Sequence, residues 1–258
     1  MPREIAPLAL AVNAALDRVA QAYLAERRLT ADSAHALRAP LAVLDLRLQA
    51  VEAGAPPDAA ALRGDVDELT RIVAALLQLA RHEHGRGEVA RLNLARLARE
   101  AAAAVAPALG AEGRALDVDL PVSLEIDGDP ASLRDAITAL LDNGRVHGRG
   151  AVRVRLAAEG REAVLAVSDE GSGPPPDAAE LIFERFHKAD GASPGAGLGL
   201  AIVRQVARRH GGGARFTDGA TAELRLPLSR AASEGRARTE ERRLPSQVDV
   251  SRATDEGA

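Results

Sequence analysis

The chain has 258 residues, 47% hydrophobic and 27% charged, a balance that is ordinary for a globular protein and excludes wholesale disorder and a collagen-like repeat. Because it contains no cysteine, a disulfide framework, a thiolate nucleophile, an iron–sulfur cluster and a Cys-ligated zinc site are all excluded. A formal net charge of −4 and an aromatic content of 2% argue against a basic nucleic-acid binder and against base-stacking platforms, so no nucleic-acid partner is expected.

The N-terminal segment is apolar but too short to span a bilayer. Residues 5–16 are interrupted by Pro7 and Asn13 and fall short of the roughly 20 residues that a transmembrane helix needs. Arg3 followed by Glu4 is a poor match to the leader of a secretory signal peptide. We therefore expect no membrane contact within this chain and a cytoplasmic location.

Two successive stretches carry apolar residues at alternating spacings of four and three, which is the pattern of a heptad seam. The first seam comprises Leu37, Leu41, Leu44, Leu48 and Val51, and the second comprises Leu62, Val66, Leu69, Val73 and Leu76. The segment 52–58 between them contains Gly54, Pro56 and Pro57 and predicts a turn. The result is an antiparallel helical hairpin. Because two helices cannot bury both seams, we expect a homodimer in which two hairpins form a four-helix bundle.

One histidine of the first hairpin helix is placed outside its seam. With Leu37 at heptad position d, His35 falls at position b and should face solvent. Pro40 lies inside the apolar stripe, where it removes a backbone hydrogen bond and frees the carbonyl of Ala36. This strain next to an exposed histidine suggests a function, and the alternative is that Pro40 simply begins a new helix.

Beyond Gly85 and Gly87, which mark a linker, helices and strands alternate. The patterns predict helices over 94–108, 131–143 and 198–210, and strands over 115–120, 123–126, 151–157, 163–167 and 220–226. From about Ser229 the sequence is rich in Arg, Glu and Ser with almost no apolar periodicity, which predicts a disordered tail.

Three clusters in this second region could bind a nucleotide. Asn143, at the end of a predicted helix, offers a carboxamide oxygen that suits Mg²⁺ and its phosphates, although a helix C-cap is an equal alternative. Asp169 follows a strand in Asp-Glu-Gly-Ser-Gly, so its carboxylate can accept from the amino group of a base, and a plain turn would look similar. The glycine triplet of residues 195–199 opens a helix whose free amides and dipole form a phosphate site.

Taken in this order, the elements resemble the catalytic core of a sensor histidine kinase, from a HAMP-like Glu4-Ile-Ala-Pro-Leu8 to about Leu228. The resemblance implies an α+β fold with a HAMP-like segment at 1–28, a helical-hairpin dimerisation and phosphotransfer domain at 29–86, a GHKL-type α/β sandwich that binds ATP at 87–228, and a tail at 229–258. It implies autophosphorylation from ATP and Mg²⁺ and transfer to an aspartate on the receiver domain of a response regulator. The chain would then be the cytoplasmic part of an inner-membrane sensor kinase, although Met1 is equally compatible with a naturally soluble kinase.

The resemblance also assigns roles to individual residues. His35 matches the phospho-accepting histidine, Asn143 the Mg²⁺-binding asparagine and Asp169 the adenine-recognising aspartate. Lys188 falls where the family usually has an Arg near the γ-phosphate, and residues 174–194 would form a lid over ATP. The remaining nucleotide-binding residues lie in the two glycine boxes and the phenylalanine box: Gly171, Gly173, Phe183, Gly195, Gly197, Leu198 and Gly199.

The hairpin departs from the family pattern at two positions next to the histidine. Ala36 replaces the acidic residue that acts as a base, and Asp32, one helical turn before His35, is the expected substitute. Ala39 replaces the Thr or Asn linked to the phosphatase reaction, so phosphatase activity is doubtful.

The ATP-binding region departs from the pattern at two more positions. Ala139 replaces an asparagine and Val146 replaces a basic residue, so fewer side chains are expected to contact the metal and the phosphates. Arg145 is a candidate to compensate for this loss. Two alternatives therefore stay open. One is a phosphotransfer scaffold with weak or absent kinase activity, and the other is a different GHKL ATPase in which ATP drives closure.

Overall fold

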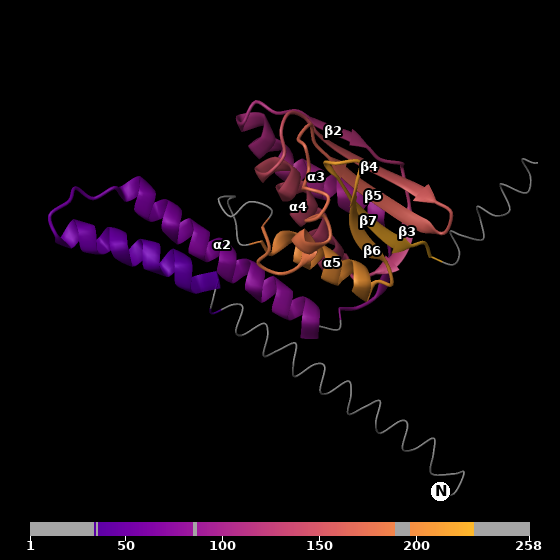
Figure 1. Cartoon of the computed structure of the whole chain (residues 1–258). Coiled ribbons are helices and arrows are strands. Elements are labelled where there is room, and N and C mark those ends of the chain that lie inside the picture. Colours follow the sequence, from indigo (N-terminus) through magenta and orange to yellow (C-terminus); the bar gives the residue numbers. More distant parts are fainter. Residues whose placement is uncertain (1–33, 35, 85–86, 189–196, 230–258) are drawn as a thin grey trace, which may run out of the picture.

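The computed structural model describes residues 34, 36–84, 87–188 and 197–229, which form a helical hairpin and an α/β domain (Figure 1). Asp32, His35 and Gly195, together with the HAMP-like segment and the tail from residue 230 onward, lie outside the described residues. Within the described ranges, no helix combines the length and the apolar character that crossing a membrane requires.

The hairpin consists of a helix over residues 36–52 and α2 (Ala59–His84). Asp58 starts α2, because its carboxylate accepts the backbone N–H groups of Ala60 at 3.1 Å and Ala61 at 3.0 Å. Arg47 Nε pairs with Asp65 Oδ2 at 2.8 Å and ties the two helices together. The first helix continues through Pro40, so the alternative that Pro40 begins a new helix is wrong.

Each predicted seam divides into two rows in the single chain. One row is half-buried and comprises Leu37, Leu44 and Val51 in the first helix and Leu62, Leu69 and Leu76 in α2. The other row is 44–50% exposed and comprises Leu41, Leu48, Val66 and Val73. A single hairpin therefore leaves about half of each apolar seam uncovered.

The α/β domain is built on a five-stranded sheet with the order β2-β4-β5-β7-β6 and a small two-stranded sheet of β1 and β3. β2 pairs with β4 in parallel and every other strand pair is antiparallel. The strands are β1 (Ala90–Asn93), β2 (Leu116–Asp119), β3 (Glu125–Gly128), β4 (Val152–Glu159), β5 (Glu162–Ser168), β6 (Gly213–Thr217) and β7 (Thr221–Pro227).

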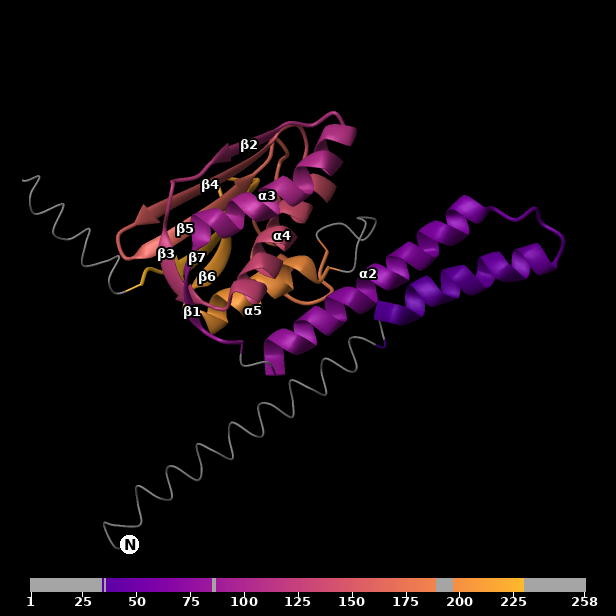
Figure 2. The same cartoon turned by 180° about the vertical axis from the view of Figure 1, so that it is seen from behind.

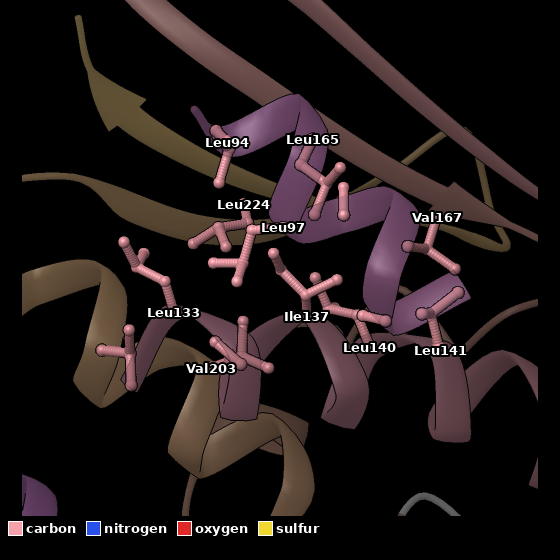
Figure 3. Close-up of a cluster of buried hydrophobic side chains, with 14 of the residues drawn as sticks. Leu94, Leu97, Leu133, Ile137, Leu140, Leu141, Leu165, Val167, Val203 and Leu224 are labelled. Carbon is pink, nitrogen blue, oxygen red and sulfur yellow. The ribbon is translucent and has the colours of Figure 1, made fainter. Parts of the chain in front are cut away.

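Three helices cover one face of the five-stranded sheet, α3 (Leu94–Ala111), α4 (Pro130–Val146) and α5 (Gly199–Arg209) (Figures 1 and 2). Burial alternates along β4 and β7, so one face of each strand is buried and the other reaches solvent. Figure 3 shows the core between the layers, where Leu97, Ile137, Leu165, Val203 and Leu224 are at most 3% exposed. The expected α/β sandwich is confirmed.

Side chains at the helix starts explain where α3 and α4 begin. Asn93 Oδ1 accepts the N–H of Arg96 at 3.2 Å, and Asp129 Oδ1 accepts the N–H of Ala131 at 3.1 Å. Pro130 occupies the first turn of α4, where its missing N–H costs nothing.

The described fold ends slightly beyond the predicted boundary. Ser229, the first residue assigned to the tail, is 2% exposed, its N–H donates to Glu125 O, and its hydroxyl accepts from Arg91. The folded domain therefore reaches at least to Ser229.

The second hairpin helix is also part of the core of the α/β domain. Leu79 is fully buried in the same hydrophobic cluster as α3, α4 and α5, and Ala75 and Leu76 pack against that cluster. Figures 1 and 2 both show α2 running beside α5. Leu79, which the sequence assigns to the hairpin domain, therefore belongs to the core of the α/β domain.

Candidate nucleotide site

A cavity of about 830 Å³ opens at the end of the α/β domain that faces α2. Its volume lies within the range of small-molecule sites. It is lined by eight of the residues predicted to bind the cofactor: Asn143, Asp169, Gly171, Gly173, Lys188, Gly197, Leu198 and Gly199. The structure thus brings together residues of α4, the loop after β5 and the start of α5, which lie far apart in the sequence.

Phe183 was expected to bind the cofactor, but it does not line the cavity among the described residues. It lies in the short 3-10 helix η1 (Leu181–Phe183), where it is 2% exposed and its ring centroid is 5.7 Å from that of Phe216. The Arg204 guanidinium lies 5.8 Å from the Phe183 ring centroid. Ile182 and Phe216 form the cavity wall, and Phe183 supports that wall from behind.

Asp169 directly follows β5, and its carboxylate is held at the cavity by backbone donors. Its Oδ1 accepts the N–H of Gly171 at 2.6 Å and that of Arg149 at 3.1 Å. The adjoining glycines allow this close approach, since a Cβ on Gly148 would lie 2.3 Å from Asp169 Cγ. A carboxylate fixed in this way can accept hydrogen bonds from the amino group of a base.

Two glycines of the cavity have backbone conformations that other residues rarely adopt. Gly173 has φ +66°, and a Cβ there would lie 2.0 Å from Gly219 O. Gly197 has φ +67°, and a Cβ there would lie 2.7 Å from His187 O. Because Gly197 O also accepts the N–H of Phe186 at 2.9 Å, the segment that carries Lys188 is tied to the start of α5.

The start of α5 suits a phosphate group. Gly199 is the first helical residue, and the first N–H groups of a helix have no partner within the helix. These free donors and the positive end of the helix dipole favour an anion. Lys188 adds a positive charge on the same cavity.

The end of α4 contributes Asn143 and one residue that the sequence analysis missed, His147. His147 and Lys188 both line the cavity. Burial lowers the pKa of His147, and the positive charge of Lys188 lowers it further. The sequence contains a signal for His147, because it lies four residues after Asn143 and residues four apart share one face of a helix.

The residues present fit a Mg²⁺ ion that is shared with a nucleotide. Within the described part of the chain, Asn143 has no side-chain hydrogen-bond partner, so its amide oxygen is available to a metal. No group of three or more carboxylates and imidazoles that could hold a metal occurs among the described residues. An ion at this position would therefore take its remaining ligands from phosphate oxygens and water, as Mg²⁺ commonly does.

Arg145 does not compensate for the missing basic residue at position 146. Its guanidinium pairs with Glu112 at 2.6 Å and approaches Asp142 at 3.6 Å, and it does not line the cavity. Burial raises the pKa of Asp142 even though the charge of Arg145 opposes that shift.

Another wall of the cavity comes from the hairpin. Arg71, Ala75 and Gln78 of α2 line it, and Arg134 of α4 lies on the same cavity. None of the α2 residues was expected at the site, because the sequence assigns residues 29–86 to a separate hairpin domain.

The comparisons with known proteins agree with this site. Residues 128–230 match the family described as histidine kinase-, DNA gyrase B-, and HSP90-like ATPase. The chain is 34% identical over 266 residues to the signal transduction histidine-protein kinase/phosphatase MprB of Mycolicibacterium smegmatis, covering 92% of this chain and 53% of that protein. It is 35% identical over 229 residues to the probable sensor histidine kinase TcrY of Mycobacterium tuberculosis, covering 81% of this chain and 48% of that protein.

The chain is also similar to solved structures of histidine kinases. Full-length ShkA in complex with AMPPNP has a TM-score of 0.55 and 29% identity, over 66% of this chain and 38% of that one. The Acinetobacter baumannii histidine kinase AdeS has a TM-score of 0.62 over 76% of this chain and 98% of that one, and at 22% identity it supports the fold alone. The chain spans about half the length of the curated relatives it matches. It belongs to the sensor histidine kinases, with an ATP-binding domain of the histidine kinase-, DNA gyrase B-, and HSP90-like type.

Proposed function

We propose that the chain is the kinase core of a two-component system, which binds Mg·ATP in the cavity and transfers the γ-phosphoryl group to His35. One observation carries the proposal: a single cavity gathers Asn143, Asp169, Lys188 and the start of α5, in a chain that also carries the histidine-bearing hairpin. The phosphoryl group would then pass to an aspartate of a response-regulator receiver domain.

Each cavity residue has a defined task in this proposal. Asp169 accepts the adenine amino group, and Gly171 and Gly173 let the base approach the backbone. Lys188 and the first N–H groups of α5 bind phosphate oxygens, while Asn143 offers its amide oxygen to the metal. When bound, Mg²⁺ supplies positive charge that offsets the charge on the phosphates. Most of the catalysis would then come from positioning and charge neutralisation.

The transfer step forms a bond between the γ-phosphorus and a ring nitrogen of His35 and breaks the bond to the β–γ bridging oxygen, so that ADP leaves. The proton on the other ring nitrogen must then be lost, and we assign its acceptance to Asp32. Because Ala36 replaces the usual acidic base, and general-base help contributes roughly 10² to 10⁴ in rate, the reaction should be slow without Asp32. With Ala39 in place of Thr or Asn, phosphatase activity should be weak.

The exposed half of the hairpin seams supports a homodimer. Leu41, Leu48, Val66 and Val73 are 44–50% exposed in one chain, and pairing with a second hairpin would cover them in a four-helix bundle. A receiver domain would dock on this bundle near His35. The related fold of the histidine kinase ThkA has been solved in complex with the response regulator TrrA, at 18% identity and a TM-score of 0.63.

Incubation of the full chain with Mg·ATP labelled at the γ-phosphate separates this proposal from its two alternatives. Acid-labile, base-stable label on the protein supports the kinase. Nucleotide binding without label would favour a phosphotransfer scaffold, and free phosphate without protein label would favour another ATPase of this fold.

Asp169→Asn is the matched control for this labelling experiment. Its amide oxygen can still accept the N–H groups of Arg149 and Gly171, so the loop should keep its structure. The amide nitrogen, however, would present a donor to the adenine amino group, so both nucleotide binding and label should be lost.

A further inference from the structure

Helix α2 presents a fixed face to the nucleotide cavity. Arg71, Ala75 and Gln78 line the cavity at spacings of four and three, so they lie on one side of the helix. That side is held by Leu79, which is fully buried in the core of the α/β domain, and by Leu76, which packs against the core. The orientation of Arg71 and Gln78 toward the cavity therefore follows from buried packing.

The cavity that α2 lines also contains the start of α5, which is the predicted phosphate site. α2 packs on α5, and Figures 1 and 2 show these two helices side by side. Gly199, the first residue of α5, lines the same cavity as Arg71. The free N–H groups at the start of α5 bind anions. Asp169, which is assigned to the adenine base, lies instead in the loop that follows β5.

Arg71 has a charge that can be redirected to a phosphate. Its Nη2 pairs with Glu68 Oε2 at 2.9 Å within one helical turn, and the Arg71 side chain is 59% exposed. An exposed pair of this kind contributes little to stability, whereas a guanidinium can bind phosphate oxygens with two parallel hydrogen bonds. Gln78 offers an amide N–H₂ group on the same face.

We propose that Arg71 and Gln78 of α2 are nucleotide-binding residues, with Arg71 on the terminal phosphate of a nucleoside triphosphate. The inference rests on the proposed function, because it requires ATP in this cavity. Arg71, a residue of the hairpin, would then supply some of the phosphate binding that Val146 cannot provide. Since a nucleoside diphosphate lacks the terminal phosphate, α2 would favour ATP over ADP. By linkage, ATP would favour the docked position of α2 more strongly than ADP does.

The test is equilibrium binding of Mg·AMPPNP and Mg·ADP to the full chain, measured by calorimetry, which needs no phosphotransfer. Arg71→Ala should weaken AMPPNP binding about tenfold, the effect of one charged hydrogen bond, and change ADP binding less than about twofold. Arg71→Lys should recover only part of the loss, because lysine keeps the positive charge but cannot form two parallel hydrogen bonds to a phosphate. Gln78→Ala should weaken AMPPNP binding about threefold, in line with a neutral hydrogen bond.

Arg63→Ala is the matched control, since Arg63 is an exposed arginine of the same helix that does not line the cavity. It should bind both nucleotides as the parent does. Arg71→Gln serves as a second variant if the alanine variant unfolds, because glutamine keeps the helix propensity and removes the charge. Unchanged AMPPNP binding in folded Arg71 variants, or an equal loss for AMPPNP and ADP, overturns this inference and leaves the proposed function standing. Failure of the parent to bind either nucleotide overturns both.

Discussion

The Arg114 guanidinium donates to the carbonyl of Gly144 at 2.9 Å and closes the end of α4 that carries Asn143. The same guanidinium donates to Gly150 O at 2.7 Å and to the carbonyl of Arg145. The last carbonyls of a helix have no partner within the helix, and they form the negative end of its dipole. Arg114 therefore provides hydrogen-bond donors for the last carbonyls of α4 and fixes the direction in which Asn143 and His147 enter the cavity.

Replacing Arg114 should affect stability and nucleotide binding together. Arg114→Ala should lower the free energy of unfolding by about 2 kcal/mol, because it leaves the terminal carbonyls without a charged donor. Arg114→Lys should recover part of that loss, since lysine keeps the charge but cannot reach the three carbonyls of Gly144, Arg145 and Gly150 in the same way. Urea unfolding and ATP affinity of the full chain measure the two effects.

The control for Arg114 is Arg96→Ala, which removes a surface pair with Glu100 at 2.9 Å and should change the unfolding free energy by less than about 1 kcal/mol. Equal effects of the Arg96 and Arg114 variants would show that Arg114 does not hold α4.

The two hairpin seams predict a dimer that one charged residue disrupts. Leu48→Glu places a carboxylate on the exposed row of the first seam, where a partner hairpin would bury it without a counter-charge. The variant should sediment as a monomer at concentrations where the parent is a dimer. Analytical ultracentrifugation provides the measurement.

Leu46→Glu is the matched control for the dimer. Leu46 is 65% exposed on the same helix but falls outside the seam, so a dimer should persist. If Leu46→Glu dissociates the chain as strongly as Leu48→Glu, the exposed seam row is not the dimer surface.

The pH dependence of stability should include a contribution from Glu223 on β7. Burial by itself would raise the pKa of Glu223, but hydrogen bonds from Arg225 at 2.9 Å and Arg215 at 3.1 Å outweigh it, and the pKa falls below its ordinary value of 4.5. A group whose pKa is lower in the folded state stabilises the fold above its unfolded pKa. That stabilisation is lost as the pH falls through the folded pKa.

Glu223→Gln tests this linkage by removing the charge and keeping an oxygen acceptor. The variant should be less stable than the parent at pH 7 by about 1 kcal/mol, and the difference should shrink as the pH is lowered from about 5 to 3. Chemical unfolding across this pH range measures the difference. A gap between variant and parent that is the same at pH 3 and pH 7 would contradict the assignment.

The sequence predicts α3, α4 and α5 well, because amphipathic periodicity is a local property and Asn93, Asp129 and Pro130 mark the helix starts. It also predicts β2, β3, β4, β5 and β7 with shifts of one or two residues at most boundaries. It misses β1 and β6. β1 becomes a strand through pairing with β3, which lies beyond α3 and β2 in the chain, and β6 pairs with β7, the strand that directly follows it. β6 begins directly after two of the glycines that end α5, so its sequence indicates a helix stop and not a strand.

The site is predictable where residue type and spacing carry the chemistry, as for Asp169, Asn143 and the glycines. The position of Phe183 behind the cavity wall depends on packing against Phe216 and Arg204, which no local pattern shows. The α2 wall was missed for a related reason, because Arg71 enters the site only after Leu79 anchors the helix on another part of the fold.

The central claim is that the cavity supplies phosphate to one imidazole, and mapping the phosphorylated residue tests it most directly. After incubation with Mg·ATP, mass spectrometry at alkaline pH should place a single phosphoramidate at position 35. The variant His35→Gln should carry none while binding ATP with the affinity of the parent. Phosphate retained in His35→Gln, or found on another histidine such as His82 or His84, would contradict the account.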